Sequence, residues 1–137
     1  MAATVSEIMS GLKGRLATVS GLRTTDYLPD NVNPPVAIPA LESIDYHQSS
    51  RGGAAVHELT VTVIVGSASE RSAQSRLDGY LSYSGDSSIR AAIEGDPTLG
   101  GVAQTCIVTS AGGISAIEIG SANTRYLIAT WNVTVYA

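Results

Sequence analysis

Charged residues are scarce in this sequence. Lys, Arg, Asp and Glu make up 15% of its 137 residues, against about 25% in typical soluble domains. So little charge favours a chain that covers much of its surface in an assembly, although a monomer rich in Ser, Thr and Gly would have the same composition. The eight basic residues form no cluster and the net charge is −4. Tight nucleic-acid binding is therefore excluded as the main role, because it needs a basic surface.

The sequence also lacks the marks of secreted and membrane proteins. Its single cysteine, Cys106, allows no intramolecular disulfide, and in the apolar run TCIV we expect it to be a small buried strand residue. No apolar run approaches the ~20 residues that span a bilayer. The N-terminal residues MAATVSEIM have neither the basic region nor the apolar run of a signal peptide. We expect a product made in the cytoplasm that has no membrane partner.

The pattern of helices and strands predicts one α+β domain over residues 1–137. The expected sheet is rich in antiparallel pairs, with an N-terminal helix and two central helices packed on one face. Helices are predicted over 4–19, over 67–83 and from Asp86 or Ser87 to Gly95, the first two opened by the capping boxes Thr4–Glu7 and Ser67–Glu70. Strands are predicted over 22–28, 36–48, 56–65, 102–110, 115–120 and 126–136, with turns at 111–113 and 120–124.

Two predicted strands alternate clearly between apolar and polar residues. Over 56–65, the residues Leu59, Val61, Val63 and Val65 share one face, and Thr60 and Thr62 lie on the other. Over 126–136, apolar residues again alternate with Thr130 and Thr134. This alternation indicates one buried face and one face that meets solvent or a partner. The four threonines are candidate subunit-interface residues, because Thr can both pack and form hydrogen bonds across strands.

No arrangement of residues points to catalysis. The local group that comes nearest is Asp45, His47, His57 and Glu58, but its spacing matches no familiar metal site or triad. The link VGSASE between a strand and a helix lacks the lysine and glycines of a phosphate-binding loop. We expect no enzyme activity, no metal and no cofactor. A small hydrolase or metal-binding domain built on these residues is the weakest alternative.

One long stretch resembles a known family. The run RLDGYLSYSGDSSIRAAIEGDPTLGG, residues 76–101, has a helix, a glycine, a short helix containing Ser-Ile, an acidic end and a Leu-Gly-Gly entry into a strand. In this order of elements it resembles the tail terminator family of long-tailed bacteriophages. The layout of the rest of the chain is also similar, with an N-terminal helix, a Pro-rich segment, a β-hairpin and a long final strand.

The resemblance implies a mechanical function. Members of this family form a ring, usually of six subunits, at the head-proximal end of the tail tube, where they stop tube growth and meet the head connector. The expected partners are therefore other copies of the chain, the tail tube protein and a connector or stopper protein, in the virion neck. DNA would pass through the ring without specific binding. Another neck component, such as a head-side connector or stopper, is the alternative.

An acidic lumen would let DNA slide without adhering to the ring. The acids Asp30, Glu42 and Asp45 lie in predicted loop or edge segments. We take them as candidate lumen-facing residues, with ordinary surface charge as the alternative.

Overall fold

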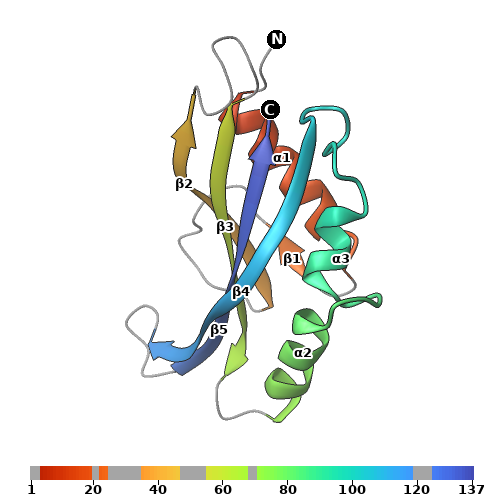
Figure 1. Cartoon of the computed structure of the whole chain (residues 1–137). Coiled ribbons are helices and arrows are strands. Elements are labelled where there is room, and N and C mark those ends of the chain that lie inside the picture. The colour runs from red at the N-terminus through yellow and green to blue at the C-terminus, as the bar shows by residue number, and fades with distance from the viewer. Residues whose placement is uncertain (1–3, 20–21, 25–34, 47–54, 68–70, 119–124) are drawn as a thin grey trace.

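A five-stranded sheet with helices on one side forms the framework of the protein (Figure 1). The computed structural model describes residues 4–19, 22–24, 35–46, 55–67, 71–118 and 125–137. The sheet order is β1-β2-β3-β5-β4. Only β1 and β2 pair in parallel, and the other three pairs are antiparallel. The predicted α+β class is confirmed. The elements are α1 (Val5–Leu16), β1 (Arg23–Thr24), β2 (Val36–Asp45), β3 (Val56–Ser67), α2 (Arg71–Leu81), α3 (Ile89–Glu94), β4 (Thr105–Glu118) and β5 (Arg125–Tyr136).

The main core lies between the three helices and one face of the sheet, which we call the helix face. Each helix contributes its buried residues to the same apolar cluster as the strands. The largest side chain there is Trp131 of β5, which is 2% exposed. Burial of this apolar surface is the main force holding the layers together. The helices contribute Ile8, Leu12, Leu16, Ala73, Leu77, Tyr80, Ile89 and Ile93, and β3 contributes Leu59, Val61, Val63 and Val65.

The strand alternation predicted for β3 and β5 is confirmed by burial. In β3, the apolar set from Leu59 to Val65 is at most 1% exposed, whereas Glu58 on the other face is exposed. We call that other face, which none of the three helices covers, the open face (Figure 1). It carries a small apolar cluster of its own, formed by Val36, Ile38 and Ile64 with Tyr126 and Ile128 beside them.

The capping box predicted at the start of α1 is present. The Glu7 amide donates to Thr4 Oγ1 at 3.1 Å, and the Thr4 amide donates to Glu7 Oε1 at 3.0 Å. These bonds from Thr4 favour the charged form and lower the pKa of the Glu7 carboxyl. The helix ends at Leu16 rather than Val19, although Val19 still packs in the core. The box predicted at Ser67–Glu70 lies partly outside the described residues, and the turn predicted at 120–124 lies wholly outside them.

The predicted cap of α3 was wrong by one or two positions. The structure has Ser88 at the N-cap, not Asp86 or Ser87. Ser88 Oγ accepts the Ala91 amide at 3.1 Å and donates to the Ser82 carbonyl at 2.5 Å, while the side chain is 1% exposed. Several adjacent residues here are of types that cap helices well, so the sequence alone does not choose between them. Contact with the end of α2 decides which one is the cap. Gly95 ends α3 as predicted.

The prediction of two strands separated by a turn at Ala111–Gly113 was also wrong. A single strand, β4, runs through from Thr105 to Glu118 and pairs with β5 along its length. The register shifts between Val108 and Ser110 and again between Gly112 and Ser115. Each shift inserts one extra residue, a β-bulge, and Gly113 supplies the left-handed backbone that the second one needs (φ 63°). The turn-like residues therefore bend the strand without ending it.

Pro39 of β2 lies at an edge of the sheet. β1 pairs only with Val36 and Ala37, so from Ile38 onward the outer side of β2 has no described neighbour. Proline tolerates such a position because it has no amide to donate. The register shift of β2 occurs two residues later, between Leu41 and Ser43. The last residues of the predicted 22–28 and 36–48 strands lie outside the described part of the chain.

Candidate functional site

The four candidate threonines lie together on the open face. Thr60 and Thr62 come from β3, and Thr130 and Thr134 come from β5. Thr62 is directly opposite Thr130, and Thr134 is opposite Glu58. Residues opposite each other on two strands point to the same face, so the antiparallel register joins two separate sequence patterns into one surface.

Hydrogen bonds within the chain already engage these hydroxyls. Thr134 donates to Glu58 Oε2 at 3.0 Å and is 6% exposed. The Thr62 and Thr130 hydroxyls lie 3.5 Å apart, and Thr60 donates to Glu42 Oε1 at 3.4 Å. The first bond is charge-assisted and within the usual range of distances, whereas the other two are longer than that range. Thr134 is therefore bound within its own chain, and Thr60, Thr62 and Thr130 keep more surface for solvent or a partner.

The acids predicted to face a lumen share this surface. Glu42 and Asp45 are exposed residues of β2, and Asp45 is opposite Val56, whose side chain lies on the open face. Glu58 of β3 is a third exposed acid there. The sequence analysis missed Glu58 in this role, although its place beside Thr60 and Thr62 in the alternation was the signal. Asp30 lies outside the described residues.

The described residues of the hydrolase or metal alternative do not converge. His57 is 4% exposed and alternates onto the helix face with Leu59, while Glu58 and Asp45 point to the open face. The Nδ1 atom of His57 has no hydrogen-bond partner. In the part of the chain that the structure describes, no three His, Cys, Asp or Glu residues could hold a metal ion. His47 lies outside that part.

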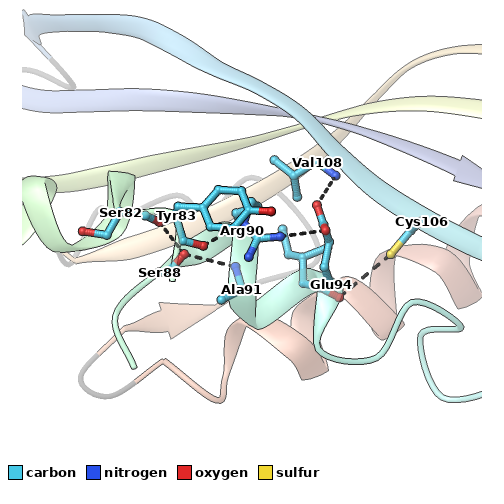
Figure 2. Close-up of polar contacts among 9 residues, drawn as sticks. Ser82, Tyr83, Ser88, Arg90, Ala91, Glu94, Cys106 and Val108 are labelled. Atoms are coloured by element: carbon cyan, nitrogen blue, oxygen red, sulfur yellow. Dashed lines mark hydrogen bonds and ion pairs between the residues drawn. The ribbon is translucent and has the colours of Figure 1, made fainter. Parts of the chain in front are cut away.

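The corner between α2 and β4 is held by a polar network (Figure 2). Arg90 Nη1 contacts Glu94 Oε1 at 2.8 Å, its Nε donates to the Tyr83 carbonyl at 2.7 Å, and its guanidinium lies 3.8 Å from the centre of the Tyr83 ring. Glu94 Oε2 accepts the Val108 amide at 3.0 Å. Glu94 thus ties α3 to the first part of β4.

Asp96, two residues after Glu94, also has a structural role. Its carboxylate accepts the Thr98 hydroxyl at 2.7 Å and the Gly100 amide at 3.0 Å. The Thr98 bond, followed by the Gly100 bond, holds the pKa of Asp96 below its ordinary value. Glu94 and Asp96 thus shape the entry into β4.

Beyond this corner, β4 is an exposed sheet edge. It is the last strand of the sheet, and most of its residues after Val108 are exposed. Ile107, Ile114 and Ile117 are 42%, 53% and 40% exposed. No charged residue occurs between Thr105 and Ile117. The sequence analysis missed this surface because it interpreted Ala111–Gly113 as a turn.

A cavity of about 280 Å³ lies beside this edge on the helix side. The strands contribute Val108, Ala111 and Trp131 to its lining, and the helix side contributes Leu81, Tyr83 and Arg90. Figure 2 shows Tyr83 and Arg90 between the helices and β4, close to Val108. Ser82, Thr109 and Ser110 complete the lining. The cavity is therefore a mainly apolar pocket with one cation on its wall, next to the outer edge of β4.

Comparison of the sequence with models of known protein families and with curated proteins finds no match. None of the helices in the described ranges is long and apolar enough to cross a membrane.

Proposed function

We propose that the protein is a structural component of a bacteriophage neck. In this proposal, copies of the chain form a ring at the head-proximal end of the tail tube, end tube growth and join the tail to the head connector. The resemblance over residues 76–101 is the starting point. The stretch forms the corner at which α2 and α3 lead into β4, and the α+β layout agrees with the layout that the resemblance implies. The proposal requires no cofactor and no catalytic residue.

The observation that carries the proposal is that exposed threonines and exposed acids share the open face. The sequence analysis assigned the threonines to subunit contacts and the acids to the lumen, yet Thr60 bonds to Glu42 on one face. The threonines belong to internal strands, β3 and β5, and their hydroxyls already have partners. We therefore assign the exposed part of the open face, where these threonines and acids lie, to the wall of the DNA passage. Exposed carboxylates there would repel the DNA backbone and keep it sliding.

A head-side connector or stopper is the second candidate, because it would need the same ring and the same unreactive passage. The two candidates differ in where the ring sits on the particle. Labelled protein at the head-proximal end of isolated tails supports the terminator, whereas label on isolated heads supports the connector or stopper.

The direct experiment adds the purified chain to polymerising tail-tube protein of the same phage. Electron microscopy then measures tube length and locates rings. The proposal predicts shorter tubes that carry one ring at one end. Tubes of unchanged length without rings, together with a chain that stays monomeric, contradict it.

A further inference from the structure

We propose that neighbouring copies of this chain join edge to edge through their sheets. The outer edge of β4 in one copy pairs with the outer edge of β2 in the next copy, and Leu41 of that next copy fills the cavity beside β4. The inference rests on the ring of the proposed function, and it names the surface that would close the ring.

The two edges belong to one sheet, and among the described residues most of their length has no neighbouring strand. Within that part of the chain, β4 ends the sheet on one side, and on the other side β1 pairs with Val36 and Ala37 of β2. From Ala40 to Asp45, all residues but Ile44 are exposed. An open edge presents a row of backbone donors and acceptors that another strand can take up. Proteins usually protect a lone edge with charges, and β4 has none between Thr105 and Ile117, which indicates that a partner covers it.

Strand direction favours β2 of a second copy as that partner. β2 is antiparallel to β3, β3 to β5, and β5 to β4, so β2 and β4 run in opposite directions. A rotation about an axis roughly parallel to the strands preserves direction. It brings β4 of one copy beside β2 of the next as an antiparallel pair, the kind already used in most of the sheet. A contact between two different surfaces of the chain closes a ring when the rotation closes.

The side chains at the two edges fit the same arrangement. Leu41 is opposite Leu59 and therefore lies on the helix face, where it is 37% exposed. The cavity opens on the helix face too, since its strand residues Ala111 and Trp131 are opposite each other on that face. When β2 of the next copy extends the sheet beyond β4, Leu41 of that copy lies over this cavity. The cavity volume of about 280 Å³ exceeds the volume of a leucine side chain. Burying an exposed leucine in an apolar pocket favours the contact.

The bulges of β4 make this edge selective. Two register shifts bend the strand, so a flat strand cannot follow it along its whole length. Glu94 already binds the Val108 amide, and Arg125 Nη2 donates to the Ala116 carbonyl at 3.2 Å, so the segment for pairing begins at Thr109. β2 carries a bulge of its own between Leu41 and Ser43.

Crosslinking tests the pairing. In a chain that carries Cys106→Ala, Leu41→Cys and Ala111→Cys are combined, and a short bismaleimide bridges them across the contact. We expect a ladder of covalent oligomers that ends at the subunit number of the ring, and no ladder from either cysteine alone. The matched control pairs Ala111→Cys with Gln74→Cys, an exposed position of α2, and should give none. The reaction is run with and without tail-tube protein, in case the ring assembles only on tubes.

Each result distinguishes this inference from the proposed function. Rings that form without the Leu41–Ala111 crosslink overturn the inference and leave the function standing. A ladder without binding to tubes supports the inference and contradicts the function. Covalent dimers from Ala111→Cys alone reveal a symmetric contact between two β4 edges and overturn the inference. A chain that is monomeric in both conditions overturns both proposals.

A second variant provides a readout without cysteines. Leu41→Asp places a carboxylate in the apolar cavity, and we expect it to weaken assembly by about tenfold or more. Gln74→Asp is the control and should assemble normally. Both variants should fold, because Leu41 is partly exposed at an edge and Gln74 is exposed. Circular dichroism checks this. Normal assembly of folded Leu41→Asp overturns the inference.

Discussion

Two neighbouring strands, β5 and β4, differ sharply although they pair along their length. β5 lies between β3 and β4, and its residues Ala129, Trp131, Val133 and Val135 are at most 2% exposed. β4 is two residues longer, yet it contains two bulges, lies at the edge and exposes three isoleucines. An internal strand is completed by its own chain. An edge strand with apolar, uncharged residues is complete only when something covers it.

Truncating the centre of β5 should have the largest effect. Trp131→Ala removes the largest fully buried side chain of the described residues and should cost about 3–5 kcal/mol of unfolding free energy. Its partner on β4, Ala111, is exposed, so Ala111→Ser should change stability by less than about 0.5 kcal/mol. Urea unfolding measures both. Equal losses for the two variants would contradict the contrast between the strands.

The bulges of β4 can be tested with two adjacent glycines. Gly113 has a φ of 63°, and Gly113→Ala should cost about 1–2 kcal/mol because a Cβ strains that backbone. A Cβ at Gly112 meets nothing within 4 Å, so Gly112→Ala should be neutral or stabilise by about 0.5 kcal/mol. Thermal unfolding compares the pair. A neutral Gly113→Ala would mean that the second bulge is not required.

The covered start of β4 can be distinguished from its exposed remainder by thiol chemistry. Burial, with a smaller effect from the Glu94 charge, raises the pKa of Cys106 to about 11. The folded state then holds the thiol proton more tightly than the unfolded state, so stability should fall as the pH rises from about 9 to 11. Native Cys106 should react slowly with a thiol reagent at pH 8, and a cysteine at exposed Ser110 should react quickly. Cys106→Ala should abolish this loss of stability. Fast labelling of native Cys106 would show that α3 does not cover it.

The smallest effects should come from the open face of the internal strands. Thr62→Val replaces a hydroxyl that makes only a long contact of 3.5 Å and should change stability by less than about 0.5 kcal/mol. Thr134→Val removes a buried bond of 3.0 Å to Glu58 and should cost about 1 kcal/mol. Calorimetry resolves the difference. A large loss for Thr62→Val would mean that the face stabilises the fold rather than facing a passage.

The parts of the fold that were predicted correctly depend on local periodicity. The alternation in β3 and β5 and the Thr4–Glu7 box each involve residues within a few positions of one another, so a single sequence reveals them. Burial of Cys106 followed from its apolar neighbours in the same way, and it is 1% exposed.

The errors arose where distant contacts overrule local signals. Ala111–Gly113 has the residues of a turn, but pairing with β5 keeps it in a strand. Ser88 caps α3 because its hydroxyl also reaches the end of α2 at Ser82, a contact that no spacing reveals. The shared face of the threonines and acids depends on register, and the cavity beside β4 depends on how three elements pack. Neither register nor packing can be inferred from one strand alone.

Hydrogen exchange of the chain before and after assembly tests most directly whether the edge of β4 is an interface. The account predicts that backbone amides from Thr109 to Ile117 of β4 and from Ala40 to Asp45 of β2 exchange at least about tenfold more slowly in the ring. Amides of β3 and β5 should be protected equally in both states. Assembled rings in which β4 exchanges as fast as in the free chain would contradict the account.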